Sequence, residues 1–341
     1  MRVLLLSPAD YTIHTSVTIG FERLEHSVYH YNYRKDIKKW EGNFNVHSRR
    51  LPFAYRSKWN NYFFKKINQN HRAVFDKQIP DIVFVYNNEM LLPETVAYFK
   101  KKGAKIIFFM GDNPFYTPTN DYFLHLLFQA NLVISPDSFW TEQLELMGLN
   151  NCTTEYFNSQ HVRFNNQENE NIEPHDLLFV GMSYKNSWGY KRALFLSKFA
   201  DMDIRIHGNS AWHRWLEFFP QLKDKFILKG RYSDEYMDLL HRKAKIYPFD
   251  LNPGVLNGIH LRLFDCIEYG MLPIPEYRKD IQDVFSKEHL PIITDYRKAK
   301  DIVQYYLDND TERIELVQSL KSFIRNNFNP EKSLGRILSR I

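Results

Sequence analysis

The sequence has few cysteines, no long apolar run and no strong excess of one charge. Its two cysteines, Cys152 and Cys266, cannot form a disulfide framework or a cysteine-rich zinc site, and they suit a reducing compartment. No apolar run approaches the roughly 18 residues that a membrane span needs. The opening MRVLLLSPADY has the pattern of a first β-strand and not of a signal peptide. These features predict a cytoplasmic protein.

The charge of the chain is mildly positive, with a formal net value of +5. Such a bias is too small to indicate a nucleic-acid-binding protein. It is concentrated in residues 49–66, RRLPFAYRSKWNNYFFKK, where six basic residues alternate with six aromatic ones. Two interpretations stay open: peripheral contact with an anionic membrane at the inner face, or a solvated helix whose aromatic side chains enter the core.

Metal-binding patterns are also scarce. No cluster of histidines or cysteines has metal-ligand spacing. The tripeptides at 201–203 and 308–310 match Asp-x-Asp, but the first enters a strand and the second lies between helices. We therefore expect no metal site and no bound cofactor.

Strand and helix signals alternate along the first half of the chain. Helical stretches separate apolar runs that are typical of buried strands: residues 2–8, 81–86, 105–111 and 132–136. This alternation predicts an α/β fold with a doubly wound parallel sheet. Residues 158–175 are polar throughout and have the composition of a linker.

The same alternation returns after the linker. The second half carries strand-like runs at 176–181, 203–208, 225–230, 243–249, 271–276 and 290–295, then a long amphipathic helix at 311–328. A chain of 341 residues suits two domains of about 150 residues each. The pattern predicts two Rossmann-like domains, 1–157 and 176–329, facing across a cleft. Ligands of such sheets bind beyond the carboxyl ends of the strands.

Polar residues follow several predicted strands of the second half at that carboxyl edge. They form a candidate anion- and nucleotide-binding set: Gly181, Ser183, Lys191, Arg192, His207, Arg231, Tyr232 and Asn257. Glycine allows the backbone to approach a ligand closely, and free N–H groups ahead of a helix favour anions. Each turn taken singly is also compatible with an ordinary chain reversal.

The stretch NGIHLRLFDCIEYGMLP, residues 257–273, combines an apolar stripe with charges at helical spacing. A helix that starts near His260 would present free N–H groups, and Arg262 would add a fixed cation for phosphate. Asp265 lies on nearly the same face, where it could meet ribose hydroxyls. The alternative is a helix stabilised by an Arg262–Asp265 or an Arg262–Glu268 pair, without a ligand.

Three residues of the first half are candidates for a general base. Asp112 follows a strand in MGDNPFY, and Asp10 and His14 follow the first strand. Each could take a proton from an acceptor hydroxyl. Asp at such positions is equally often a turn former or a helix cap, so both interpretations stay open.

Three segments together resemble glycosyltransferases of the spore-maturation-protein type, in the wider class of group 1-like transferases. Residues 81–114 match a strand, a Pro-Glu-Thr helix start and a strand ending in Asp-Asp-Pro, although Asn113 replaces the second Asp. LLFVG at 177–181 matches the opening of the second domain. Residues 257–276 resemble the signature R-x-F-E-x-x-A-C-G, although Asp265 replaces the glutamate.

The resemblance implies a GT-B fold, with the nucleotide-sugar donor in the second domain, the acceptor in the first, and a C-terminal helix, 330–341, packing back on the first domain. It places Arg262 at the donor diphosphate, Asp265 at the ribose, Gly181 and Ser183 near the diphosphate, and Tyr232 near the base. It places Asp112 at the first position of the Asp-Asp-Pro element. Retaining transferases that carry two glutamates with seven residues between them would have them at Asn257 and Asp265.

The resemblance thus predicts a metal-independent hexosyltransferase-like enzyme that glycosylates a glycan or lipid-linked acceptor in bacterial surface polysaccharide or lipopolysaccharide synthesis. His260 and Arg262 would stabilise the leaving diphosphate, with Lys191 and Arg192 as further candidates. A nucleotide-sugar epimerase on the same fold and a non-catalytic carbohydrate-binding or scaffold protein are the alternatives.

Overall fold

The structure, a computed structural model, describes the whole chain except residues 10–12, 49, 88–89, 117–121, 159–171 and 229–233. Contacts divide the chain into two units: unit 1 holds Met1–Ser159 and Asn329–Ile341, and unit 2 holds Gln160–Phe328. Most of the predicted linker, 158–175, lies outside the described residues. Each unit is described by itself.

Unit 1 is built on a six-stranded parallel sheet in the order β2-β1-β3-β4-β5-β6. Its strands are β1 (Arg2–Leu6), β2 (Ser27–Tyr31), β3 (Ile82–Tyr86), β4 (Lys105–Phe109), β5 (Leu132–Ser135) and β6 (Cys152–Thr154). The central strands β3 and β4 are near-continuous apolar runs because helices cover both faces of a parallel sheet.

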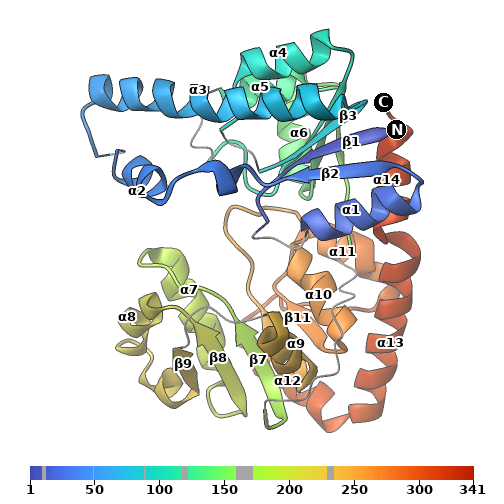
Figure 1. Ribbon diagram of the computed structural model, residues 1–341. Coiled ribbons are helices and arrows are strands. Elements are labelled where there is room, and N and C mark those ends of the chain that lie inside the picture. Colours follow the sequence, from blue (N-terminus) through green and yellow to red (C-terminus); the bar gives the residue numbers. More distant parts are fainter. Residues whose placement is uncertain (10–12, 49, 88–89, 117–121, 159–171, 229–233) are drawn as a thin grey trace. The chain divides into compact units, whose positions relative to one another are not determined.

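The helices of unit 1 alternate with these strands (Figure 1). They are α1 (Ile13–Arg23), α2 (Lys39–Ser48), α3 (Phe53–Gln78), α4 (Pro93–Lys101), α5 (Phe123–Gln129), α6 (Ser138–Leu146) and α14 (Pro330–Leu338), with a short 3-10 helix η1 (Tyr33–Asp36). Local signals set several boundaries: Pro93 starts α4, and the Asp137 side chain caps α6 by accepting from the N–H of Phe139 at 2.9 Å.

The last helix, α14, packs on α1 at the start of the chain (Figure 1). Gly20 makes this possible, because a Cβ there would lie 2.7 Å from Leu334 Cδ1 and 2.8 Å from Pro330 Cβ. Arg336 adds an ion pair with Glu155 at 2.7 Å. The C-terminal helix therefore belongs to the same unit as the first strand.

Unit 2 holds a five-stranded parallel sheet in the order β11-β10-β7-β8-β9. Its strands are β7 (His175–Val180), β8 (Ile204–Gly208), β9 (Phe226–Leu228), β10 (Ala244–Phe249) and β11 (Leu272–Pro275). The sixth predicted strand, 290–295, is wrong: that segment makes only one bridge to the sheet, between Ile293 and Glu276. The side chains of Leu290 and Ile293 are buried although this segment forms no strand ladder, so the apolar run reflects core packing and not a strand.

The helices of unit 2 are α7 (Ser187–Leu196), α8 (His213–Leu216), α9 (Asp234–Arg242), α10 (Leu261–Tyr269), α11 (Lys279–Phe285), α12 (Ala299–Asp308) and α13 (Asp310–Asn327). Four short 3-10 helices accompany them: η2 (Ser197–Phe199), η3 (Ser210–Trp212), η4 (Pro220–Lys225) and η5 (Ser286–Glu288). The long amphipathic helix predicted at 311–328 is α13. The prediction of doubly wound parallel sheets is confirmed in both units.

Candidate functional site

In the sheet of unit 2 the strand order reverses between the parallel neighbours β7 and β10. From β7 the sheet continues through β8 and β9 on one side, and from β10 it continues to β11 on the other. Crevices for ligands form beyond the carboxyl ends of strands at such points. The ladder between the two strands pairs Ala244 with His175 and Ile246 with Leu177. Loops from both sides of the sheet therefore meet beyond this pair.

A tyrosine hydroxyl takes the place of the ladder at the carboxyl end of β7. Tyr247 Oη accepts from the N–H of Val180 at 3.0 Å and donates to the C=O of the same residue at 2.8 Å. Burial raises the pKa of Tyr247 to about 12, so the hydroxyl keeps the proton that it donates. The end of β7 is thus fixed by a side chain of β10.

The turn after β7 is held by side chains that follow β8. The N–H of Ser183 donates to Asn209 Oδ1 at 2.8 Å, and Trp212 Nε1 donates to the C=O of Gly181 at 3.0 Å. The Ser183 hydroxyl is buried and has no hydrogen-bond partner among the described residues. Gly181 and Ser183 therefore form a fixed turn that offers a buried hydroxyl, as a phosphate-binding turn requires.

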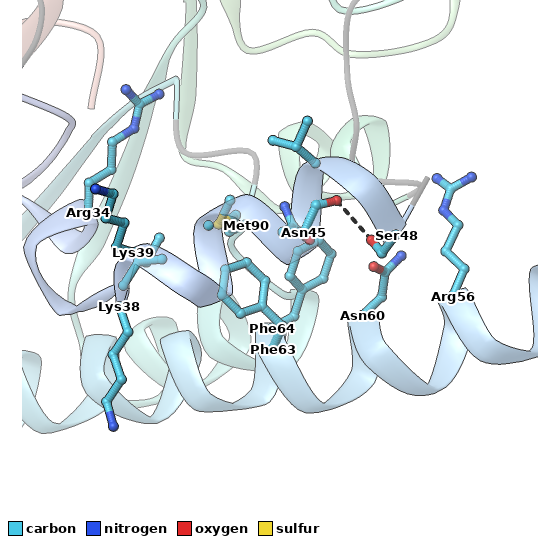
Figure 2. A pocket seen from close by; sticks show the side chains of 13 residues that line it. Arg34, Lys38, Lys39, Asn45, Ser48, Arg56, Asn60, Phe63, Phe64 and Met90 are labelled. Atoms are coloured by element: carbon cyan, nitrogen blue, oxygen red, sulfur yellow. Dashed lines mark hydrogen bonds between the residues drawn. The ribbon is translucent and has the colours of Figure 1, made fainter. Parts of the chain in front are cut away.

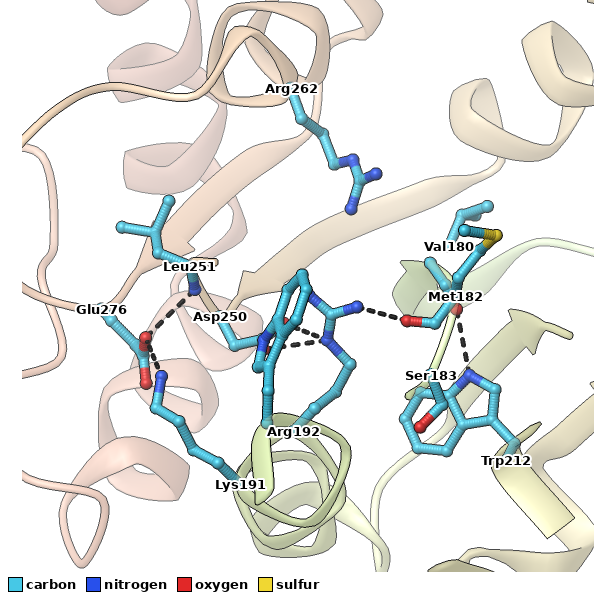
Figure 3. Close-up of polar contacts among 12 residues, drawn as sticks. Val180, Met182, Ser183, Lys191, Arg192, Trp212, Asp250, Leu251, Arg262 and Glu276 are labelled. Atoms are coloured by element: carbon cyan, nitrogen blue, oxygen red, sulfur yellow. Dashed lines mark hydrogen bonds and ion pairs between the residues drawn. The ribbon is translucent and has the colours of Figure 1, made fainter. Parts of the chain in front are cut away.

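The two predicted cations of α7 are engaged with carboxylates of unit 2 (Figure 3). Arg192 Nε donates to both oxygens of Asp250 at 2.8 and 2.9 Å, and both side chains are buried. Lys191 Nζ lies 2.6 Å from Glu276. Because each cation is neutralised, these residues tie α7 to the ends of β10 and β11, where they support the turn.

Arg262 differs from these two cations. Its guanidinium extends from α10 toward the end of β7 and the Arg192 side chain (Figure 3), and its Nη1 lies 3.4 Å from Tyr247 Oη. In the described part of the chain no carboxylate lies within ion-pair distance of it. The nearest negative groups, Asp250 and Asp265, act on it only at longer range, so this guanidinium at the switch point is suited to a phosphate.

His260 caps the helix that carries Arg262. Its Nδ1 accepts from the N–H of Arg262 at 3.1 Å, so this nitrogen carries no proton in the capped form. Desolvation by the surrounding protein and then the positive charges of Arg262 and Arg192 lower the pKa of His260, although part of the ring is exposed. His260 thus ends the loop and starts α10 with its N-terminus at the sheet edge.

The remaining charges of α10 serve different purposes. Glu268 is buried and pairs with Arg325 of α13 at 2.7 Å, and its C=O accepts from Lys321 Nζ at 2.7 Å. The alternative of an Arg262–Glu268 pair is therefore excluded, and no ion pair joins Arg262 to Asp265 in the described residues. Asp265 is half-buried one turn beyond Arg262.

Four further predicted donor residues are placed as follows. The C=O of Asn257 accepts from the N–H of Asp280 at 3.0 Å, and the residue is half-buried. His207 is buried at the end of β8, with its ring centroid 6.5 Å from that of Tyr236. Arg231 and Tyr232 lie outside the described residues.

Candidate bases in unit 1 lie along the carboxyl edge of its sheet. Asp112, just beyond β4, is exposed and accepts from Asn87 Nδ2 at 3.3 Å. Asn113 is the turn former of this loop, since its Oδ1 accepts from the N–H groups of Phe115 and Tyr116 at 2.9 and 3.1 Å. Gly111 leaves room for Asn87, which would meet a Cβ at 2.6 Å. The Asp112 carboxylate therefore points outward from a loop that Asn113 shapes.

His14 lies in the first turn of α1, stacked on His30 with ring centroids 4.6 Å apart. His30 Nε2 lies 2.9 Å from the hydroxyl of Ser7, the residue after β1. Burial, and then the nearby His14, lower the pKa of His30, which the hydrogen bond to the Ser7 carbonyl partly opposes. Asp10 lies outside the described residues.

Residues 49–66 fall mainly in α3, and their aromatic side chains divide between core and surface. Phe63 is buried with Tyr33 and Ile67. Phe53, Tyr55 and Tyr62 stay exposed, with 81, 66 and 53 % of their surface accessible. The core interpretation thus holds for Phe63, and membrane contact of this segment stays a prediction.

Three residues of this site were not among the sequence candidates: Asp250, Trp212 and His30. Asp250 follows an apolar strand directly, which is the same signal that identified Asp112. No signal in the sequence pointed to Trp212, whose Nε1 donates to the C=O of Gly181. This contact needs the close approach of Gly208, where a Cβ would lie 2.3 Å from Trp212 Nε1.

Comparison with known proteins agrees with this geometry. Residues 191–339 match a family described as glycosyl transferase-like. Sucrose-phosphate synthase from Thermosynechococcus elongatus is similar in structure, with a TM-score of 0.65 at 11 % identity over 100 % of this chain and 98 % of that one. The apo lipopolysaccharide outer core galactosyltransferase WaaB gives 0.58 at 12 % identity over 100 % of both chains.

A putative UDP-N-acetylglucosamine 2-epimerase from Listeria monocytogenes is also similar, with a TM-score of 0.60 at 13 % identity over 99 % of this chain and 95 % of that one. No curated protein sequence matches the chain. The fold is therefore the GT-B fold, and the resemblance to GT-B glycosyltransferases is confirmed at the level of the fold, with a family match that covers residues 191–339. The narrower likeness to the spore-maturation type stays a prediction.

Among the described residues, no helix is both long and apolar enough to cross a membrane. Nowhere in the same residues do three His, Cys, Asp or Glu side chains gather closely enough to hold a metal ion.

Proposed function

We propose that this protein is a glycosyltransferase that moves a sugar from a nucleotide-sugar donor to a hydroxyl of a glycan or lipid-linked acceptor. The observation that carries the proposal is the uncompensated Arg262 guanidinium at the unit 2 switch point. It faces a glycine turn with a buried, unsatisfied Ser183 hydroxyl. Together with the α10 N-terminus, this arrangement would bind a diphosphate.

In the reaction, the acceptor oxygen forms a bond to the anomeric carbon while the bond from that carbon to the diphosphate oxygen breaks. Arg262 and the helix N-terminus would stabilise the charge on the departing diphosphate, as a metal does in other folds. We therefore expect metal-independent transfer of a hexose. If the reaction inverts the anomeric centre, Asp112 is the proposed base that takes the acceptor proton, with Asp10 and His14 as the other candidates.

The setting that we propose is bacterial surface polysaccharide or lipopolysaccharide synthesis at the inner face of the membrane. WaaB, a lipopolysaccharide outer core galactosyltransferase that shares the fold, supports this setting. The start of α3 supports peripheral contact with anionic lipids, since the side chains of Phe53, Tyr55 and Lys58 are all exposed there. Vesicles rich in phosphatidylglycerol should therefore sediment the protein, and Phe53→Ser with Tyr55→Ser should reduce this.

The test of the donor site is a calorimetric titration with UDP, GDP, CMP and dTDP and their sugars. UDP is the first choice because the similar epimerase is named for a UDP-sugar. Arg262→Ala should weaken nucleotide binding by about tenfold or more, as for a lost charge-assisted hydrogen bond, and Arg262→Lys by less. Arg297→Ala, an exposed arginine of the same unit, is the matched control.

Each alternative has its own outcome in this experiment. Conversion of the sugar nucleotide without an acceptor would identify the epimerase, which the likeness to the Listeria protein makes the second candidate. Absence of any nucleotide binding would identify the non-catalytic protein. Binding that Arg262→Ala leaves unchanged would reject the assigned site.

A further inference from the structure

Unit 1 contains a pocket of about 390 Å³ that is lined by residues between Arg34 and Met90. It lies among η1, α2 and α3, with Met90 contributing from the segment after β3 (Figure 2). Its volume falls within the range of small-molecule sites, roughly 300–1,000 Å³. It is therefore larger than a single inorganic ion needs.

Cations predominate among the described residues that line this pocket. These residues include Arg34, Lys38, Lys39 and Arg56, and among the described residues no aspartate or glutamate lines it. In the described part of the chain, Lys38, Lys39 and Arg56 form no ion pair. An anion would thus meet uncompensated positive charge.

The two nearest acids in the sequence are already engaged elsewhere. Glu41 is buried, pairs with Lys66 at 2.6 Å and accepts from the N–H of Lys38 at 2.9 Å. Asp36 accepts from the hydroxyl of Tyr31 and from Asn70 Nδ2. Asp36 is thus engaged away from the pocket, whereas Glu41 forms its ion pair with Lys66 and attracts Lys38 at longer range.

The positions of these cations conflict with ordinary helix preferences. Lys38 and Lys39 stand at the N-terminus of α2, and Arg56 lies in the first turn of α3, which has no acidic residue. Helix N-termini carry partial positive charge, so cations there are unfavourable. Residues that break a local rule at a concave site are expected where a ligand supplies the compensation.

The remaining lining suits a sugar. Phe63 and Phe64 form an apolar wall between the cations at the two ends (Figure 2), and Asn45, Ser48 and Asn60 add hydrogen-bonding groups. Aromatic faces pack on the apolar faces of sugar rings, and a few polar groups fix orientation. Phe63 is held in place by a stacked Trp59, with ring centroids 5.3 Å apart.

From this lining we infer that the pocket binds a phosphate-bearing sugar, and that the acceptor of the reaction carries a phosphate or diphosphate next to its sugar. The role of this ligand as acceptor rests on the proposed glycosyl transfer. Binding of a phosphate-bearing sugar to the pocket does not depend on that proposal. Lys38 and Lys39 hold the phosphate at one end, Phe64 lies against the ring, and Arg56 donates hydrogen bonds to the sugar at the other end.

The test is calorimetry with glucose 1-phosphate at low ionic strength, with UDP present in excess so that the donor site is filled. Lys39→Ala and Arg56→Ala should each weaken binding about tenfold, and raised salt should weaken wild-type binding. Lys77→Ala is the matched control, since it removes the same charge from an exposed position of α3 outside the pocket, and it should bind as the wild type does.

A second probe, a short-chain alkyl ester of the same sugar phosphate, distinguishes the two sources of this chemistry. Tighter binding of the ester, still dependent on Lys39 and Arg56, identifies a lipid-linked sugar phosphate; equal binding identifies a soluble one. Binding of plain glucose as tight as that of glucose 1-phosphate, no binding of either probe, or unchanged binding in both variants would overturn the inference. Because nucleotide binding is scored separately with Arg262→Ala, failure of either proposal leaves the other measurable.

Discussion

At the scale of single residues, the environment of each charged group separates support from binding. Arg192 and Arg262 both face the turn after β7, yet Arg192 is buried against Asp250 whereas Arg262 contacts only a tyrosine hydroxyl. A neutralised cation can position a turn, and only the uncompensated one retains free energy for a phosphate. Spacing along the sequence did not distinguish the two.

Asp112→Asn tests the proposed base. The amide keeps the size of the side chain and can still bond to Asn87, but it cannot take a proton. We expect kcat of transfer to fall by about 100-fold or more, with nucleotide binding unchanged. Asp76→Asn, which changes an exposed carboxylate bonded to Tyr98, is the control. Full activity of Asp112→Asn would move the role to Asp10 or His14.

His71 makes the stability of unit 1 sensitive to acid. It is fully buried against Tyr31 and Tyr33, and burial lowers its pKa to about 3. Below the unfolded value of about 6.5 the unfolded chain takes up a proton that the folded chain does not. This contribution to stability is therefore complete above pH 6.5 and is lost as pH falls toward 3.

His71→Phe removes the titrating group and keeps a ring. Between pH 6 and 4.5 the free energy of unfolding of the wild type should fall with pH more steeply than that of the variant. The difference between the two slopes should be about 1.4 kcal/mol per pH unit. Urea unfolding at several pH values measures the slope. The exposed His47→Gln should keep the wild-type slope, and an equal slope in His71→Phe would contradict the prediction.

At the scale of elements, α10 is joined to α13 by a buried carboxylate. Glu268 accepts from Arg325 Nε and Nη2 at 3.0 and 2.7 Å, and the arginine is about half exposed. Glu268→Ala should destabilise unit 2 by about 1–3 kcal/mol, since solvent screens the exposed partner. A double-mutant cycle with Arg325→Ala measures the coupling by chemical denaturation, and strictly additive effects would refute the pairing.

The contact of α14 with α1 depends on one glycine. In an open helix interior Gly→Ala stabilises by about 0.5–1 kcal/mol. At Gly20 the new methyl would lie 2.9 Å from the Pro330 backbone carbon, so α14 must shift. We expect Gly20→Ala to lower the melting temperature, whereas Gly42→Ala, whose Cβ meets only Ile37 at 3.7 Å, should leave it equal or higher.

At the scale of the whole molecule, the two proposed ligands belong to different units. Hydrogen exchange should therefore show UDP protecting amides of unit 2 at residues 181–183 and the first turn of α10. Glucose 1-phosphate should protect residues 38–64 of unit 1. Protection of the same segments by both ligands would indicate one shared site and would contradict the separate assignments.

The sequence by itself determined the alternation of the two units, because runs such as IVFVY in β3 and LLFV in β7 must be buried on both faces. It also located the helix start at His260, since capping is a local interaction. It was misleading at 290–295, where an apolar run is buried with a single bridge and no ladder.

Only the tertiary structure decided which charges are compensated. Arg192 meets Asp250 from 58 residues away, and Glu268 meets Arg325 from 57. The cationic pocket likewise forms from residues between Arg34 and Met90 that three helices bring together. Such pairings follow from the packing of distant segments, and packing is set by the whole chain and not by any local pattern. For this reason the sequence could nominate Arg262 among several cations, and the structure singled it out.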